Sequence, residues 1–273
     1  MANDYNAFKL LEFESNLIPN YKGVLQGLSN RELDGLIVRN LVDKETTSGF
    51  VSALESNQYE MPLNKYYWGT VYGRVLTSKL NDLDKYYESA LEYNTKQPSI
   101  WGPEKVLNWQ DFLGSILSML YDKQANIPHF SNGNSCHSST IRFLSEGNGL
   151  VTHSDNRFPA EEPKFEDLKS ISILEDVISY FVLLQKPSSG GELTVFNARW
   201  NNKQNHPEHE HECIESIELE QSRTLELDVG DLLVFQGGDI YHRVEPIIGP
   251  IPRITIGGFI TPSIDNTSVY FWS

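Results

Sequence analysis

Cysteines, long apolar runs and an N-terminal targeting pattern are scarce or missing in this 273-residue chain. Only Cys136 and Cys213 are present, without a CxxC pair, so a disulfide framework is not indicated. No run of about 18 apolar residues occurs, which excludes a membrane-spanning helix. The first residues lack the basic and apolar segments of a secretory signal. We therefore expect an intracellular protein located in the cytoplasm.

Basic side chains are also few, because 22 lysines and arginines stand against 37 acidic residues, a formal net charge of −15. This balance argues against a phosphate-binding surface and hence against a nucleic-acid partner. It is compatible with a small anionic substrate that meets one or two local arginines. As partners we expect a small-molecule substrate, no nucleic acid and no membrane, and we allow for a homodimer.

Aromatic residues are plentiful, with 13 Phe, 13 Tyr and 5 Trp, and the apolar fraction of 39% supports a substantial core. Residues 1–130 have a largely helical pattern that we expect to support a sheet. The run 34–42 suits a strand, and Asp43 stands where the N-cap of a following helix would lie. The segments 80–95 and 108–123 carry the apolar spacing of amphipathic helices.

From about residue 138 the pattern changes to short β-type runs separated by glycine-rich turns. The runs are STIRFL (138–143), ISYFVLLQ (178–185), ELTVF (192–196), RTLELDV (223–229), DLLVFQ (231–236) and RITIGGFIT (253–261). Many short strands after a helical block predict an α+β protein, a double-stranded β-helix (jelly-roll or cupin-like barrel) buttressed by N-terminal helices. We expect one domain over residues 1–273, with the barrel core in residues 131–273.

The segment NNKQNHPEHEHECIE (201–215) holds three of the seven histidines, His206, His209 and His211. A metal site is one interpretation. However, the segment carries proline, lies between predicted strands and interleaves histidine with glutamate, which is typical of a solvated loop. We predict a loop in which metal binding is absent or adventitious.

Another set of residues has the spacing of metal ligands. His153 and Asp155 are two positions apart, and alternate residues of a strand point to the same face. His242, which follows a strong strand and a glycine-rich turn, is a candidate third ligand. Two histidines and one carboxylate form the facial triad of non-haem Fe(II) oxygenases. An HxD motif alone arises often by chance, so the downstream residues decide the interpretation.

Arg253 is the most informative of these downstream residues, because it opens the apolar strand RITIGGFIT eleven positions after His242. A guanidinium facing a barrel interior is costly unless a carboxylate partner meets it. An acid cosubstrate bound in bidentate fashion would be such a partner. Gly190 and Gly191, at the start of GGELTVF, allow a tight turn that helps to close the barrel.

Together these residues resemble the Fe(II)/2-oxoglutarate-dependent dioxygenase superfamily. The resemblance rests on HSD, GGELTVF, GDLLVFQGGDIYHRV and the downstream Arg253, and it covers roughly residues 138–262. Within the superfamily, the chain is similar to bacterial small-molecule (amino-acid or natural-product) hydroxylases related to the non-haem iron halogenases. The resemblance implies that His153, Asp155 and His242 are catalytic iron ligands and that Arg253 holds 2-oxoglutarate.

The resemblance also implies where the rest of the pocket lies. Thr140 and Arg142 share one face of their strand and would lie near 2-oxoglutarate, although Arg142 could instead meet an anionic substrate or point outward to the surface. Apart from the resemblance, the aromatic segment SVYFWS is unfavourable in water, so Trp272 and Phe271 would form a lid over the pocket or part of the core. Residues after the HxD motif commonly line the substrate side, here Asn156, Arg157 and Phe158.

The implied activity consumes O2 and 2-oxoglutarate, releases succinate and CO2, and hydroxylates an unactivated C–H bond. Related halogenases replace the motif carboxylate with a small residue that admits chloride. Because Asp155 is retained here, hydroxylation is favoured over halogenation, while desaturation, cyclisation and epoxidation stay open. Two further alternatives are a cupin-like ligand-binding protein without turnover and a hydroxylase that acts on a protein side chain.

Overall fold

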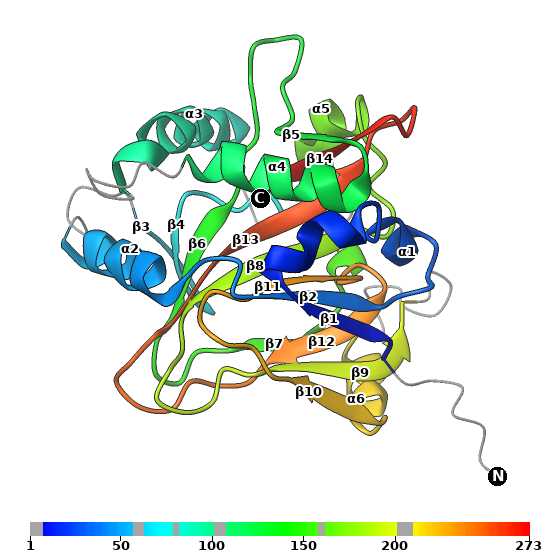
Figure 1. The fold of residues 1–273 in the computed structure, drawn as a ribbon. Helices are drawn as coiled ribbons and strands as arrows, with labels where there is room; N and C mark the ends of the chain where they lie inside the picture. The colour runs from blue at the N-terminus through cyan, green and yellow to red at the C-terminus, as the bar shows by residue number, and fades with distance from the viewer. Residues whose placement is uncertain (1–7, 57–62, 79–81, 101–107, 158–161, 201–209) are drawn as a thin grey trace.

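Two β-sheets face each other, and helices cover the outer side of the larger sheet, in the computed structural model (Figure 1). The smaller sheet lies at the bottom of the view in Figure 1. This arrangement confirms the predicted α+β, jelly-roll class. The structure describes residues 8–56, 63–78, 82–100, 108–157, 162–200 and 210–273.

The larger sheet combines strands from both halves of the chain. Its strands are β1 (Leu10–Glu14), β2 (Gly35–Arg39), β3 (Leu63–Tyr66), β4 (Gly69–Tyr72), β5 (Gln124–Asn126), β6 (Thr140–Leu144), β8 (Ile178–Gln185), β11 (Leu232–Phe235), β13 (Arg253–Pro262) and β14 (Ser268–Trp272). They follow the order β1-β2-β11-β8-β13-β6-β4-β3, with β14 pairing β13 and β5. The largely helical first region therefore also supplies strands to this sheet.

The smaller sheet carries two of the predicted ligands. It consists of β7 (Leu150–His153), β9 (Leu193–Arg199), β10 (Ser222–Leu225) and β12 (Ile240–Val244), all antiparallel in the order β10-β9-β12-β7. The turn into β9 uses Gly190 and Gly191 at φ values of 73° and 75°, a left-handed conformation that glycine adopts without strain. The glycine pair thus has the tight-turn role that the sequence indicated.

Side-chain alternation divides the interior into two layers. Along β8, Val182 and Leu184 belong to the apolar cluster shared with the helices, whereas Leu183 belongs to the cluster between the sheets. Likewise on β13, Ile254 and Ile256 face the helices. Because successive side chains of a strand point to opposite faces, the intervening residues face the space between the sheets.

The helices form where the sequence places their start signals and apolar stripes. The Asp43 carboxylate accepts a hydrogen bond from the backbone N–H of Thr46 at 2.7 Å, which caps α2. Asn108 is the N-cap of α4, whose apolar stripe is buried against the larger sheet. The helices are α1 (Gln26–Ser29), α2 (Lys44–Ser56), α3 (Leu83–Ile100), α4 (Trp109–Tyr121), α5 (Glu166–Lys169) and α6 (Glu210–Glu218), with 3₁₀ turns η1 (Ser15–Tyr21), η2 (Asp155–Arg157) and η3 (Pro163–Phe165).

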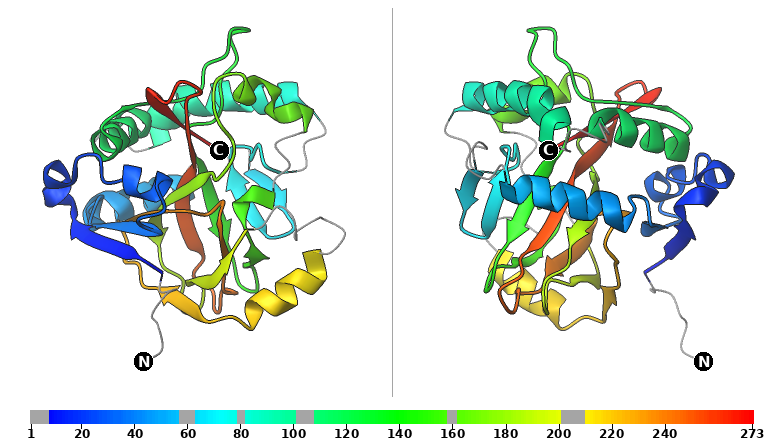
Figure 2. Two further views of the ribbon diagram at one scale, coloured as in Figure 1. Left: turned by 90° about the vertical axis from the view of Figure 1, so that its right-hand side faces the viewer. Right: turned by 60° about the vertical axis from the view of Figure 1, so that its left-hand side comes forward.

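One prediction was wrong in part: the segment 201–215 is not a loop throughout, because α6 begins at Glu210. Ile217 of α6 packs against Phe196 and Tyr241, which gives the helix an apolar anchor outside the smaller sheet (Figure 2). The charged composition hid this short amphipathic pattern. His206 and His209 lie outside the described residues, as does the side chain of His211.

No helix in the described part of the chain is both long and apolar enough to cross a membrane.

Candidate metal centre

His153 and His242 lie opposite each other across two paired strands. His153 ends β7, and His242 is its direct cross-strand partner on β12. The two ring centroids are 4.3 Å apart. Asp155 begins the 3₁₀ turn that follows β7, which brings its carboxylate to the same place. The HxD motif and the distant histidine therefore meet because β7 and β12 pair in this register.

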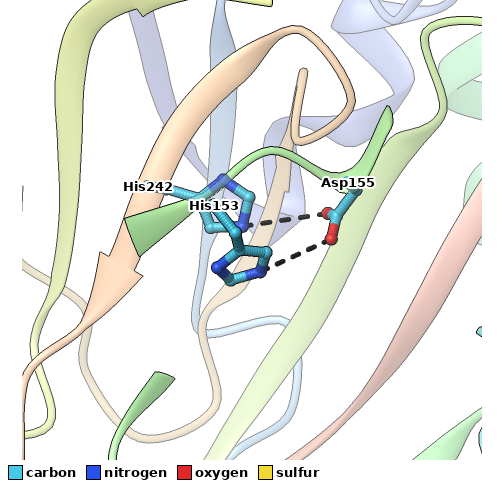
Figure 3. Close-up of side chains that lie close together, drawn as sticks. All are labelled: His153, Asp155 and His242. Atoms are coloured by element: carbon cyan, nitrogen blue, oxygen red, sulfur yellow. Dashed lines mark ion pairs between the residues drawn. The ribbon is translucent and has the colours of Figure 1, made fainter. Parts of the chain in front are cut away.

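The three side chains converge on one point, as Figure 3 shows. Their potential ligand atoms all lie within 4.8 Å of one another. Nε2 of His153 is 3.6 Å from Oδ1 of Asp155, and Nε2 of His242 is 3.8 Å from Oδ2. All three residues are buried. The spacing leaves room for an ion between two nitrogens and one carboxylate, which is the composition of a facial triad.

The backbone sets the orientation of both imidazoles. Nδ1 of His153 lies 2.7 Å from the carbonyl oxygen of Val151, and Nδ1 of His242 lies 2.9 Å from that of Ile240. A carbonyl oxygen only accepts, so each Nδ1 carries the proton and donates it. Each Nε2 therefore presents its lone pair toward Asp155. Such hydrogen bonds fix the tautomer and ring orientation of metal-binding histidines.

Two residues that the sequence analysis did not single out support Asp155. The hydroxyl of Ser179, on the inner face of β8, donates to Oδ2 of Asp155. The backbone N–H of Asp155 donates to the carbonyl of Gly237 at 2.8 Å. A Cβ atom on Gly237 would lie 2.5 Å from Oδ2 of Asp155, so only glycine leaves space for the carboxylate. The QGGD turn (236–239) can be recognised in the sequence, but its contact with Asp155 cannot be predicted from it.

The pKa of Asp155 lies below its ordinary value. Burial alone would raise this pKa, but the interactions of the carboxylate with the His153 and His242 rings and with the Ser179 hydroxyl outweigh it. The carboxylate form that a metal requires is therefore the favoured form.

An ion-paired network holds the turn that carries Gly237. Arg199 pairs with Asp239 at 2.5 Å and with Asp34 at 2.6 Å. The side-chain amide of Gln236 donates to the carbonyl of Leu33 at 3.0 Å. These contacts tie the turn between β11 and β12 to the chain before β2, so the position of Asp155 depends on residues far from it in sequence.

An inner cavity of 60 Å³ adjoins the three ligands and lies between the two sheets. Its apolar walls include Phe181, Leu193, Phe235 and Val244. Arg253 lines the cavity and is only 6% exposed. Its guanidinium carbon lies 5.0 Å from the centre of the Phe181 ring, and no ion pair to it occurs among the described residues. The predicted inward position of Arg253 is therefore realised.

Burial, and secondly the nearby charge of Arg142, lower the pKa of Arg253 to about 10. The side chain stays protonated at neutral pH and keeps a positive charge in a buried place. Such a charge is costly without a partner, and a carboxylate matches the guanidinium in bidentate geometry. Gly191 leaves space beside it, because a Cβ there would lie 3.1 Å from Cδ of Arg253.

Thr140 and Arg142 share the inner face of β6, as expected, but only Arg142 reaches the cavity. Arg142 lines it together with Thr255, its cross-strand partner on β13. The Thr140 hydroxyl instead hydrogen-bonds that of Ser273 at 2.7 Å, and Thr140 is not among the residues that line this cavity. The outward alternative for Arg142 is wrong, since its side chain faces the interior.

The predicted substrate residues have different positions. Asn156 points away from the cavity, because its side-chain amide donates to Asp176 at 2.8 Å. Trp272 is buried, donates to Thr261 at 3.2 Å and lines a small cavity of 20 Å³ beside Asp155. It is therefore core rather than lid. The side chain of Arg157 and all of Phe158 lie outside the described residues.

These residues fit an Fe(II) ion with 2-oxoglutarate. The donors are two imidazole nitrogens and one carboxylate, and they leave coordination positions of the metal open, which suits non-haem iron. The lone pairs face a cavity that is also lined by Arg253, a buried cation with no ion pair to the described part of the chain. A dicarboxylate that bound the ion at one end would reach toward Arg253 with the other.

Comparison with known proteins gives the same assignment. The family model described as carrier-protein-independent halogenase WelO5 matches residues 7–273. No curated protein matches the chain.

Among solved structures, the chain resembles an N-substituted L-amino acid dioxygenase from Burkholderia ambifaria AMMD. The TM-score is 0.52 at 14% identity, with 90% of each chain covered. The same dioxygenase in complex with alpha-KG also matches, with a TM-score of 0.52 at 14% identity, 94% of this chain and 90% of that one being covered. At this identity the likeness shows the shared fold. By its full-length match to the family model, the chain belongs to the WelO5 family of Fe(II)- and 2-oxoglutarate-dependent oxygenases.

Proposed function

We propose that the protein hydroxylates an unactivated C–H bond of a small molecule, an amino acid or a natural-product intermediate. The observation that supports this proposal is the position of Asp155, whose oxygens lie 3.6 Å and 3.8 Å from the two imidazole nitrogens. His153, Asp155 and His242 would bind iron, and Arg253 would hold the far carboxylate of 2-oxoglutarate. Bound iron, 2-oxoglutarate and O2 supply the oxidant, with release of succinate and CO2.

The protein side chains contribute orientation and exclusion of water. The two Nδ1–H groups hold the imidazoles in place, and Ser179 holds the carboxylate. The inner cavity is walled by Phe181 and Phe235, which keep bulk water from the reacting atoms. Arg253 would orient the cosubstrate by its charge and its planar geometry.

The family description names halogenases, but hydroxylation fits this chain better. In the related halogenases a small residue stands in place of the motif carboxylate and admits chloride. Here Asp155 occupies that position with both oxygens directed toward the histidines. Carrier-protein independence, as the family description states it, supports a substrate that is free in solution.

We also propose that residues 1–273 act as one domain in the cytoplasm, without a nucleic-acid or membrane partner. The net charge of −15 and the two cysteines support this. A homodimer is compatible with the proposal, and sedimentation of the purified protein would measure the oligomeric state.

The test is anaerobic titration of the protein with Fe(II) and 2-oxoglutarate, followed by a screen of small molecules for coupled succinate formation in air. We expect a weak visible charge-transfer band and products that have gained one oxygen atom. His153→Ala and Asp155→Ala should lose turnover, whereas His129→Ala, at an exposed histidine, should keep it. A metal-loaded protein with neither band nor succinate would favour a cupin-like binding protein.

A further inference from the structure

Two arginines, the buried Arg253 and the half-buried Arg142, line the inner cavity, and the expected cofactors with Asp155 neutralise only one of them. Burial lowers the pKa of each guanidinium, but both keep their positive charge at neutral pH. The charges of Fe(II) and of doubly ionised 2-oxoglutarate cancel each other. The Asp155 carboxylate cancels one guanidinium. One positive charge therefore remains among these groups, and the further carboxylate that acts on Arg253, that of Glu192, is exposed to solvent and so compensates it only weakly.

Arg142 is the cation that is placed to meet a bound anion. It lines the inner cavity and also an outer cavity of 300 Å³, whereas Arg253 lines the inner cavity and a different cavity of 570 Å³ beside Gly190 and Gly191. Its Nε is buried and has no hydrogen-bond partner. His153 and Asp155 also line the outer cavity, but His242 does not. The outer cavity thus reaches the metal centre without contacting Arg253, and Arg142 is the cation that both cavities share.

The walls of the outer cavity are aromatic and apolar. Tyr66 and Trp68 stack with ring centroids 5.2 Å apart and an interplanar angle of 11°. The Arg142 guanidinium carbon lies 6.0 Å from the Trp68 ring centre. At the rim, Tyr67 is 84% exposed and Val151 is 62% exposed, and both line the cavity. Large apolar groups left in water beside a concave site are typical of a binding surface.

We infer that the substrate is an anion with one carboxylate or equivalent oxyanion on a planar, mostly apolar skeleton. Its oxyanion meets Arg142, and its skeleton lies along Tyr66 and Trp68 and extends toward Tyr67. This inference rests on the proposed function and names the substrate class of the same site. It follows from the remaining positive charge, the unpartnered Nε and the stacked aromatic wall.

The test compares pairs of probes in which a carboxylate is replaced by a neutral amide on the same ring system. Indole-3-acetate and 2-naphthylacetate are compared with their neutral amides by calorimetric titration of the anaerobic Fe(II)·2-oxoglutarate holoenzyme. We expect the carboxylates to bind at least about tenfold more tightly than the amides, since a hydrogen bond to a charged group contributes about 1.5–3 kcal/mol. Arg142→Gln should remove this preference and leave the amides unchanged, and Arg142→Lys should restore part of it. Arg223→Gln, at an exposed arginine, is the matched control.

Any outcome other than these expected ones contradicts the inference. Equal binding of acid and amide to the wild-type protein, or no binding of either, contradicts an anionic substrate site, and this comparison does not depend on whether Arg142→Gln folds. If Arg142→Gln weakens 2-oxoglutarate binding and leaves the probes unchanged, Arg142 serves the cosubstrate instead. The proposed function is measured independently of the probes, by the charge-transfer band and by succinate formed without substrate. Loss of these two signals would contradict the proposed function, whereas loss of the acid preference alone would contradict only the substrate class.

Discussion

The imidazole of His153 faces that of His242 as a direct cross-strand pair between β7 and β12. Irregularities in the pairing of β12 flank His242 on both sides, one against β9 after Ile240 and one against β7 before Val244. Such bulges redirect single side chains and are common beside active sites. The metal centre therefore depends on strand register, because a shift by one residue would turn a histidine to the opposite face.

Gly237→Ala should disrupt the metal centre without a ligand being changed. The added Cβ would lie 2.1 Å from the Ser179 hydroxyl oxygen and 2.5 Å from the Asp155 carboxylate, so both must move. Loss of such supporting contacts typically costs about 10–100-fold in metal affinity. Fe(II) affinity measured by anaerobic titration checks this. Gly49→Ala, where a Cβ meets nothing within 4 Å, is the control, and equal affinities of the two variants would contradict the prediction.

Arg253→Gln should weaken 2-oxoglutarate binding while Fe(II) still binds. The variant keeps the polar chain but removes the charge and the two-pronged geometry that match a carboxylate. Removing one member of a buried charged pair costs about 2–5 kcal/mol, so we expect the Kd of 2-oxoglutarate to rise by about 30-fold or more. The amplitude of the visible band against cosubstrate concentration gives the Kd. An unchanged Kd would exclude Arg253 as the partner of the cosubstrate.

Trp272→Ala should destabilise the whole fold rather than open the active site. Trp272 is buried, contacts Phe259 and Phe165, and donates to Thr261. Truncation of a large buried side chain costs about 3–5 kcal/mol of unfolding free energy. Denaturant unfolding measures this, with Tyr270→Ala, at a half-buried position of the same strand, as the comparison. A variant of normal stability with altered substrate affinity would instead indicate a lid.

Stability should fall in acid because of His137, which lies apart from the metal ligands. Burial, and secondly the charge of Arg74, lower the pKa of this imidazole from 6.5 to about 3. The unfolded chain takes up the proton first, so His137 favours folding above pH 6.5 and this contribution is lost as the pH falls toward 3. The slope approaches about 1.4 kcal/mol per pH unit.

Urea unfolding between pH 7 and pH 4 checks this slope. His137→Gln removes the titrating group and should flatten the pH dependence, whereas His129→Gln, at an exposed histidine, should leave it unchanged. The same slope in the His137→Gln variant would assign the acid sensitivity to other groups.

The sequence by itself was enough to predict the three candidate ligands and most of the strands around them. Alternation within a strand is local, so the common face of Thr140 and Arg142 could be predicted from spacing. The proximity of His153 and Asp155 was also predicted, but Asp155 reaches it from the 3₁₀ turn after β7 and not from the strand itself. The short glycine-rich turns and the N-cap at Asp43 are local signals too, and the structure confirms them. The resemblance to the oxygenase superfamily rests on these same local motifs.

Only the tertiary structure decided which distant residues support the site. Ser179 and Gly237 meet Asp155 through strand register and close packing, and neither relation has a local spacing signal. The inward position of Arg142 and the burial of Trp272 likewise depend on which face of each strand meets the opposing layer. Periodicity shows that a strand has two faces, whereas the packing of sheets and helices determines which of them lines the cavity.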